Sequence, residues 1–376
     1  MRIAIVTESF LPTLNGVTTS VCRVLDSLAA AGGHDALVIC PSPAPTSYRG
    51  FAVRTVPSVT VRAFRVGLPT RRLEGILRDF APDVVHAASP FGLGARGLAA
   101  ARNLGIPTVA IYQTDMPSYV AQHGGPIRAW AHRTSWTWVR HLHSLADLTL
   151  APSSAAAAEL ADHGVPRVAL WARGVDTDMF RPALKDDDET LALRRRLAPN
   201  GEVIVGYVGR LAPEKELHRL AEISDLPGIS IAIVGEGPSR DELQNLLPRA
   251  HFLGRQEGLT LARSYASFDV FVHTGTKETF GQTLQEAMAT ELPVVAPAVG
   301  GPLDIVKPGV TGLLFNPGLP GALRQCVGSL VSDAAMRERM GESALRKVAD
   351  RTWAGMTDRL LGYYANVTHP AWSEAA

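Results

Sequence analysis

The chain has 376 residues, 46% of them hydrophobic and 19% charged, which is the composition of a folded, soluble protein with two or three domains. These values exclude disorder, and there is no run of roughly 18 apolar residues that would predict a membrane span. The net charge of +1 hides an asymmetry, because residues 1–172 sum to +5 and the remainder to −4. We therefore expect the N-terminal half to face an anionic surface, and we do not expect nucleic acid as a partner.

The three cysteines are odd in number and widely spaced, which predicts free thiols in a reducing compartment rather than disulfides or a zinc site. The first ten residues hold one basic residue and an apolar run that is too short for a signal peptide. We therefore expect a cytoplasmic protein.

Short apolar runs alternate with helix-like segments along the whole chain. The runs are residues 2–7, 35–40, 83–88, 108–113 and 148–153, then 203–209, 229–235, 270–275, 293–298 and 312–315. Strands that are apolar on both faces and separated by helices predict parallel sheets covered by helices on both sides. A polar stretch without strand character, residues 174–201, separates the two sets, so we predict two α/β domains.

The stretch SPFGLGARGLAA has the glycine spacing of a dinucleotide-binding fingerprint, in Gly92, Gly94 and Gly97, and Asp115 follows as an acid. Such a fingerprint normally opens the first βαβ unit of its domain, whereas this one follows a later strand. The simpler interpretation is a helix start rich in small residues that packs on the sheet. NAD is therefore not expected.

Two cations follow the first strand of the second half, Arg210 and Lys215, at a spacing that lets both neutralise a diphosphate. Taken alone, they could equally be solvated surface residues.

The segment KETFGQTLQEAMA predicts an anion site at a helix start near Gln282, where Gly281 lets backbone N–H groups approach a phosphate. Glu286 is then placed to bind a ribose diol, and Glu278 to reach hydroxyl groups beyond the phosphates. Either acid alone could simply cap a helix or lie on the surface.

Six motifs within residues 1 to about 316 resemble those of the retaining GT-B glycosyltransferases of family 4. They are PTLNGVTTSV, GVDTDMF, VGRLAPEK, VGEGP, FLGR and ETFGQTLQEAMA. The resemblance implies two doubly wound Rossmann-like domains facing across a cleft, with residues 1–172 binding the acceptor and residues 173–352 the donor. A final amphipathic helix, residues 353–372, could dock on either domain, and we assign it to the first.

The same resemblance implies the donor site. Its residues would be Gly16, Arg210, Lys215, Gly235, Arg255, Glu278, Phe280, Gly281, Gln282, Thr283, Leu284 and Glu286. Of these, Arg210, Lys215 and Glu278 would also act in catalysis. No metal and no cofactor is expected, because GT-B enzymes use such cations and a helix dipole instead. The DTD of residues 176–178 is therefore interpreted as a metal-motif decoy.

One position departs from the family pattern. Relatives commonly carry a histidine after the fourth strand of the first domain, where this chain has Gln113, followed by Asp115. The Gln113 amide can hydrogen-bond a sugar hydroxyl. We predict that Asp115 is the acid or base that orients the acceptor or the donor sugar, with a helix N-cap as the alternative.

A basic and aromatic helix is expected at residues 128–145. One stripe is assigned to the core: Trp130, Thr134, Trp138, Leu142 and Leu145. The other is assigned to a lipid headgroup surface: Arg133, Trp136, Arg140 and His143. Further arginines precede it: Arg62, Arg65, Arg71, Arg72 and Arg78. An ordinary solvated basic face is an equal alternative.

Together these features predict transfer of a hexose to a lipid or glycolipid hydroxyl, by an enzyme peripheral on the inner face of the plasma membrane. The motifs WARGVDTDMFRP, YQTD and GGPLDIV resemble those of actinobacterial GDP-mannose-dependent α-mannosyltransferases. A UDP-sugar-dependent glucosyltransferase is the nearest alternative. A nucleotide-sugar epimerase would need catalytic acids that we do not find, and a non-catalytic binder would have broken donor motifs.

Overall fold

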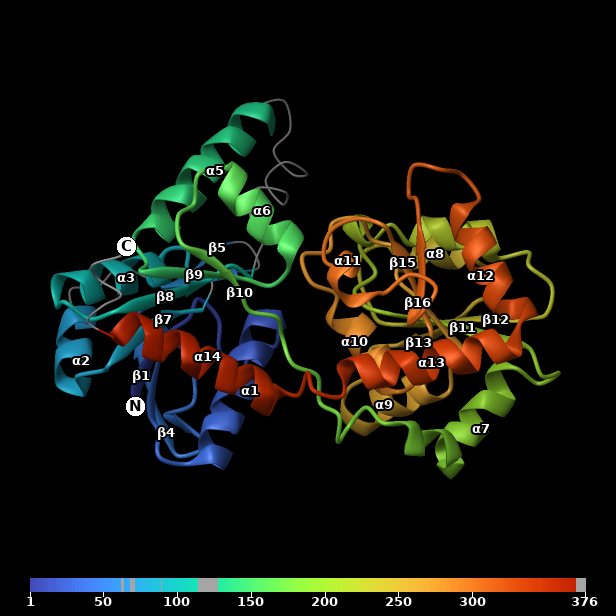
Figure 1. Cartoon of the computed structure of the whole chain (residues 1–376), viewed down its shortest axis with the longest axis horizontal. Coiled ribbons are helices and arrows are strands. Elements are labelled where there is room, and N and C mark those ends of the chain that lie inside the picture. Colours follow the sequence, from blue (N-terminus) through green and yellow to red (C-terminus); the bar gives the residue numbers. More distant parts are fainter. Residues whose placement is uncertain (62–63, 68–71, 89, 114–127, 370–376) are drawn as a thin grey trace. The chain divides into compact units, whose positions relative to one another are not determined.

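The computed structural model describes residues 1–61, 64–67, 72–88, 90–113 and 128–369. The chain divides into two compact units, drawn in Figure 1. Unit 1 combines Met1–Arg173 with Trp353–Ala376, and unit 2 is Gly174–Thr352. The predicted division between residues 172 and 173 lies one residue away.

Unit 1 is built on an eight-stranded sheet in the order β10-β9-β8-β7-β1-β2-β4-β3, parallel except for the β3–β4 pair. The strands are β1 (Arg2–Val6), β2 (Asp35–Pro41), β3 (Ser47–Tyr48), β4 (Phe51–Val56), β7 (Val84–Ala87), β8 (Thr108–Ile111), β9 (Leu148–Ala151) and β10 (Val168–Leu170). A separate antiparallel pair is formed by β5 (Ser58–Val61) and β6 (Phe64–Gly67).

Helices cover both faces of this sheet, because successive residues of a strand point to opposite sides. Ile3 and Ile5 of β1 pack in one buried cluster with α1 and α14, and Ala4 and Val6 in another with α2 and α3. The helices are α1 (Gly16–Ala31), α2 (Arg72–Phe80), α3 (Leu93–Asn103), α5 (Arg128–Ser144), α6 (Ser154–Asp162) and α14 (Trp353–Thr368).

The C-terminal helix α14 is fixed to unit 1 by two buried polar contacts as well as by packing. The indole N–H of Trp171 donates to the carbonyl of Met356 at 2.8 Å. In the core, the His86 ring on β7 hydrogen-bonds the Tyr364 hydroxyl. Because both contacts join buried polar groups, α14 is part of the core of unit 1.

Unit 2 has a six-stranded, fully parallel sheet in the order β13-β12-β11-β14-β15-β16. The strands are β11 (Val203–Val208), β12 (Ile229–Val234), β13 (His251–Gly254), β14 (Val270–Val272), β15 (Val294–Pro297) and β16 (Gly312–Phe315). The α-helices are α7 (Asp188–Leu197), α8 (Arg240–Leu246), α9 (Gly258–Ala266), α10 (Gln282–Ala289), α11 (Pro302–Ile305), α12 (Ala322–Ser332) and α13 (Ala334–Val348). Short 3-10 turns are η2 (Pro182–Asp186), η3 (Pro213–Lys215) and η4 (Leu217–Ile223).

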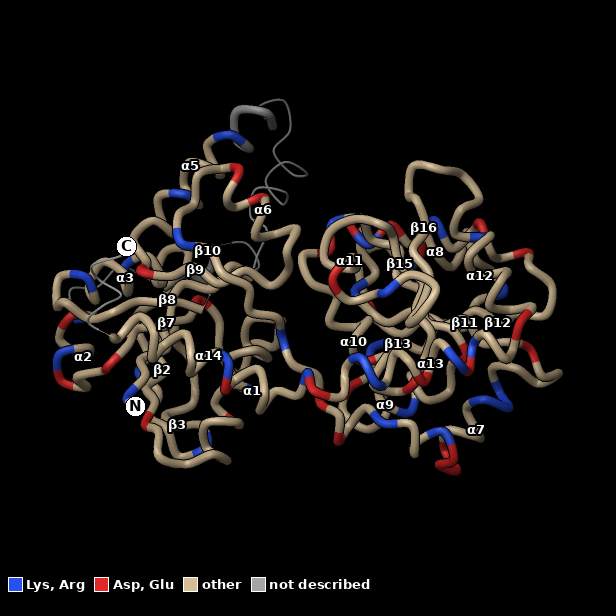
Figure 2. Tube along the Cα trace, viewed as in Figure 1, with Lys and Arg blue, Asp and Glu red and all other residues tan. Residues whose placement is uncertain are grey.

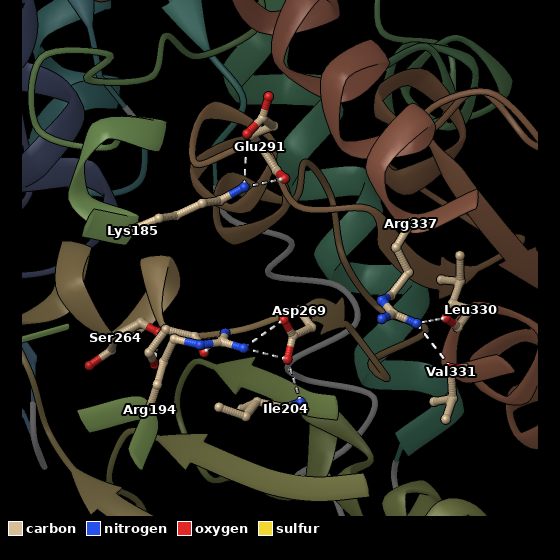
Figure 3. Close-up of polar contacts among 10 residues, drawn as sticks. Lys185, Arg194, Ile204, Ser264, Asp269, Glu291, Leu330, Val331 and Arg337 are labelled. Atoms are coloured by element: carbon tan, nitrogen blue, oxygen red, sulfur yellow. Dashed lines mark hydrogen bonds and ion pairs between the residues drawn. The ribbon is translucent and has the colours of Figure 1, made fainter. Parts of the chain in front are cut away.

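The order of the strands in unit 2 reverses between β11 and β14, and ligands of open α/β sheets bind at the carboxyl ends of such a pair. At the opposite edge, Asp269 holds these two strands together (Figure 3). Its carboxylate pairs with Arg194 of α7 at 3.0 Å and accepts the backbone N–H of Ile204 at 2.7 Å. This contact joins the amino end of β14 to that of β11.

The predicted fold class is confirmed, with every predicted strand present. The prediction missed strands β3 to β6, β10 and β13. Of these, β3, β10 and β13 lie at sheet edges, β5 and β6 form the separate pair, and β4 lies inside the unit 1 sheet between β2 and β3.

Candidate functional site

The loop that follows β11 carries both predicted phosphate cations, and each is paired with a carboxylate. Arg210 pairs with Glu214, four residues further along the chain, and its side chain is 62% exposed. The Lys215 ammonium lies 2.8 Å from the Glu278 carboxylate, with side chains 25% and 18% exposed. Lys215 ends η3, whereas Glu278 lies in the loop after β14. The structure thus brings Lys215 and Glu278 together at the β11–β14 switch point.

The Glu278 carboxylate is ionised although it is largely buried. Burial raises its pKa, but Lys215, His273 and the backbone N–H of Phe280 together lower it further, to about 2. His273 follows β14 directly, and burial lowers the pKa of its ring to about 4. At neutral pH the cluster is therefore an ammonium, a carboxylate and an uncharged imidazole.

The helix α10 begins at Gln282, where the sequence predicted a helix start. Gly281 is its N-cap at φ +107°, and a Cβ there would lie 2.9 Å from the Leu284 side chain. The N–H of Leu284 already bonds the Gly281 carbonyl at 3.0 Å. The N–H groups of Gln282 and Thr283 belong to the first turn, where a helix offers no internal acceptor. These two groups are the ones the helix can offer to a phosphate.

Several predicted donor residues have structural contacts of their own. Phe280 and Leu284 are buried, so they can offer only backbone atoms. The Gln282 side-chain amide donates to the Gly174 carbonyl at 3.1 Å. Arg255 follows β13 and pairs with Glu257 on the surface.

Gly235 is required by a close approach of two loops. It follows β12 at φ +141°, and a Cβ would lie 1.9 Å from the carbonyl oxygen of Gly209 after β11. Its N–H donates to the Gly254 carbonyl at 2.8 Å. This glycine therefore lets the ends of three neighbouring strands meet at the functional edge.

Glu286 is oriented by a tyrosine that the sequence analysis missed. The Tyr265 hydroxyl donates to the Glu286 carboxylate at 2.8 Å. Burial raises the pKa of Tyr265 well above its usual value, so the hydroxyl keeps its proton and the donation persists. Nothing local in the apolar segment of α9 marks Tyr265, because its partner is 21 residues away.

In unit 1, Arg173 joins two predicted site residues. Its guanidinium donates to the Gln113 side-chain oxygen at 2.9 Å. A Cβ on Gly16 would lie 3.2 Å from the same guanidinium, so glycine leaves space for it. Arg173 was not among the predicted site residues, although it lies in the motif WARGVDTDMFRP. Asp115, the predicted catalytic acid or base, lies outside the described residues.

The glycine fingerprint has a packing explanation. A Cβ on Gly97 would lie 2.9 Å from Val6, so the glycine lets α3 approach β1 closely. The N-terminus of α3 is occupied by a carboxylate of the chain itself. Glu8 accepts the N–H groups of Gly94 at 2.9 Å and of Phe91 at 3.2 Å.

Comparison with known proteins decides the family. The family model Glycosyltransferase Family 4 matches residues 14–179, and Glycosyl transferases group 1 matches residues 189–347. The chain is 48% identical to the GDP-mannose-dependent alpha-mannosyltransferase of Mycolicibacterium smegmatis, over 98% of both proteins. The chain is a family 4 glycosyltransferase. The enzyme named the same way in Mycobacterium tuberculosis is 47% identical over 100% of this chain and 99% of its own length.

Solved structures confirm the GT-B fold of this glycosyltransferase. Anabaena Alr3699/HepE in complex with UDP superposes with a TM-score of 0.79, covering 97% of this chain and 100% of that one at 19% identity.

The two predicted stripes of helix α5 are partly wrong in this glycosyltransferase. Trp136 and His143, assigned to the headgroup surface, are buried, whereas Trp138, assigned to the core, is 47% exposed. Trp136 packs in an apolar cluster with Tyr112 and Leu160, and the His163 ring stacks on it at 3.7 Å between centroids. Arg133 and Arg140 are exposed, as predicted. The side chains of Trp130, Arg62, Arg65 and Arg71 lie outside the described residues.

The DTD segment forms a turn. The Asp176 side chain accepts the N–H of Met179 at 3.0 Å, so this carboxylate caps its own loop. Among the described helices, none is long and apolar enough to cross a membrane.

Proposed function

We propose that this glycosyltransferase moves mannose from GDP-mannose, with retained anomeric configuration, to a hydroxyl of a lipid-linked acceptor. The observation that carries the proposal is the Lys215–Glu278 pair beside the N-terminus of α10, because it sets a cation, an acid and a helix dipole at one switch point. Two relatives named as GDP-mannose-dependent enzymes, 48% and 47% identical over nearly the whole chain, support the donor assignment.

In this proposal, the bond between the sugar C1 and the diphosphate oxygen breaks while the acceptor oxygen bonds to C1. Lys215, Arg210 and the first-turn N–H groups of α10 stabilise the charge that grows on the departing GDP. Glu278 holds sugar hydroxyl groups, and Glu286 holds the ribose diol. Asp115 orients the reacting sugar or acceptor, and the acceptor hydroxyl passes its proton to the departing diphosphate oxygen. Fixed cations take the role that a metal has in other glycosyltransferases, so the transfer is proposed to be metal-independent.

A basic groove on unit 1 supports a lipid acceptor at the inner face of the plasma membrane. Arg133, Trp136, Thr137, Arg140 and His163 line a cavity of about 270 Å³ between α5 and the end of α6. Figure 2 shows basic positions along α5. Neither Arg133 nor Arg140 forms an ion pair within the described part of the chain, so both can meet phosphate headgroups.

Donor specificity is tested by incubating the enzyme separately with GDP-mannose and UDP-glucose, with and without membrane lipid. Released nucleotide is measured, together with radiolabelled sugar in the organic phase. The proposal expects GDP release and lipid labelling from GDP-mannose when lipid is present. Lipid labelling from UDP-glucose alone would instead establish the UDP-dependent alternative.

The membrane assignment is tested by flotation with vesicles of neutral lipid, with and without about 30% anionic lipid, in line with the attraction of basic patches to anionic headgroups. The double variant Arg133→Ala/Arg140→Ala should lose binding to the anionic vesicles. A matched control removes two exposed arginines of unit 2, Arg195→Ala/Arg339→Ala, and should bind as wild type does. Equal loss in both variants would show a general charge effect and contradict the groove.

A further inference from the structure

The ion pair at the switch point presents a problem for any diphosphate that Lys215 is to bind. Its ammonium already lies 2.8 Å from the Glu278 carboxylate, so a ligand must compete with that acid. When the ammonium turns toward a phosphate, Glu278 loses its cation. A carboxylate only 18% exposed cannot regain full hydration, and stranding a buried charge is costly.

His273 is the group best placed to relieve this cost. Its ring is 2% exposed, and its Nε2 atom lies 3.7 Å from the Glu278 carboxylate oxygen that Lys215 holds. That separation is too long for a hydrogen bond but within a small side-chain adjustment of one. No described residue meets hydrogen-bond geometry with either ring nitrogen. The Gly275 backbone makes only a weaker contact with the ring, and because this contact raises the pKa of the ring, the group involved is the carbonyl, an acceptor. A buried imidazole without a full partner is unusual and calls for an explanation.

We infer that His273 is the reserve hydrogen-bond partner of Glu278. When a donor diphosphate draws Lys215 away, the neutral His273 ring donates its Nε2 hydrogen to the carboxylate. The exchange keeps the Glu278 carboxylate oriented toward the sugar while Lys215 binds the phosphate. His273 is thus a positioning residue that acts through Glu278. This inference rests on the proposed function, because it requires a ligand with a diphosphate.

The exchange predicts a difference between two probes that share a base and a ribose. GDP draws Lys215 from Glu278, whereas guanosine, which has no phosphate, leaves the pair intact. Titration calorimetry with His273→Leu should therefore show GDP binding weakened about tenfold or more, with guanosine binding unchanged. The variant His273→Gln keeps a side-chain N–H donor and should bind GDP within about threefold of wild type. A matched control is His218→Leu, at an exposed histidine of η4, which should bind both probes normally.

A purely structural role gives a different result. If His273 only fills space, His273→Leu should weaken GDP and guanosine equally or leave both unchanged, and either result would overturn the inference. If His273→Gln weakens GDP binding as much as His273→Leu does, the inference is also overturned, provided that the melting temperatures of both variants lie within a few degrees of that of wild type. Failure of the proposed function is distinguishable, because wild type would then bind neither GDP nor guanosine. In that case UDP and uridine replace them in the same comparison.

Discussion

The two sheets end in loops of contrasting chemistry. At the carboxyl edge of unit 2, cations are held by carboxylates, as in Lys215 with Glu278 and Arg210 with Glu214. At the carboxyl edge of the unit 1 sheet, two of the described charged groups bond to neutral groups instead. Glu8 accepts backbone N–H groups at the start of α3, and Arg173 donates to the Gln113 amide.

The difference distinguishes a site whose ion pairs must break before a ligand binds from a site whose side chains are already oriented. An ion pair between side chains has to exchange partners before either charge can bind a ligand, so substitutions in unit 2 should act on donor affinity. A charged group that hydrogen-bonds a neutral group orients it, and no ion pair has to break when a ligand binds. Substitutions in unit 1 should therefore act on turnover.

The largest effect is expected from Lys215→Ala. It removes a charge-assisted contact of about 1.5–3 kcal/mol and leaves the negative charge of Glu278 without its cation beside the diphosphate, so GDP affinity should fall about 100-fold or more. Arg210→Ala, at a more exposed cation, should lower affinity only about tenfold. Calorimetry with GDP measures both values. Wild-type binding in the Lys215 variant would contradict the donor site.

The second effect belongs to unit 1. Asp115→Asn keeps the size of the side chain but removes its charge, and kcat should fall on the order of 100-fold with GDP affinity unchanged. If Asp115 is only an N-cap, turnover stays near wild type, because Asn caps about as well. Gln113→His serves as the neighbouring control and should keep substantial activity, since an imidazole offers a similar hydrogen bond.

A smaller effect is expected from Arg173→Met, which preserves bulk but releases the Gln113 amide. The freed amide can rotate, so kcat should fall about tenfold, as when a positioned group loses its orientation. GDP affinity should remain that of wild type, measured by the same titration. A loss of GDP affinity without a loss of kcat would show that Arg173 acts on donor binding, as the unit 2 cations do, and would contradict the difference between the two units.

The smallest effect is expected from a chelator. Because Lys215, Arg210 and α10 are proposed to stabilise the leaving group, EDTA should leave the transfer rate unchanged. A rate abolished by EDTA and restored by magnesium or manganese would mean that the fixed cations of unit 2 are insufficient.

The strands and the site loops were predictable because their signals are local. Runs that are apolar on both faces indicate buried parallel strands, and Gly281 indicates the turn that precedes a helix start. The partners Tyr265, Arg173 and Glu8 were missed because each meets its contact through the tertiary fold, 21, 60 and 86 residues away along the chain.

The helix α5 shows the limit most clearly. Two stripes of this helix each carry a tryptophan, and the sequence of the helix does not state which one is covered. The buried face is the one that packs with Tyr112 and Leu160, and the His163 ring at the end of α6 stacks on Trp136. The rotation of such a helix is decided by its neighbour rather than by its own periodicity.

The chain enters unit 2 at Gly174 and leaves it at Thr352, and Val175 and Thr352 form a parallel bridge. Entry and exit thus lie side by side, as in a domain inserted into a host. We therefore predict that residues 174–352 can be exchanged as one cassette between relatives and, under the proposed function, would carry donor preference with them. The exchanged segment must end before Trp353, because unit 1 then keeps its own α14 and the hydrogen bonds that α14 makes with Trp171 and His86.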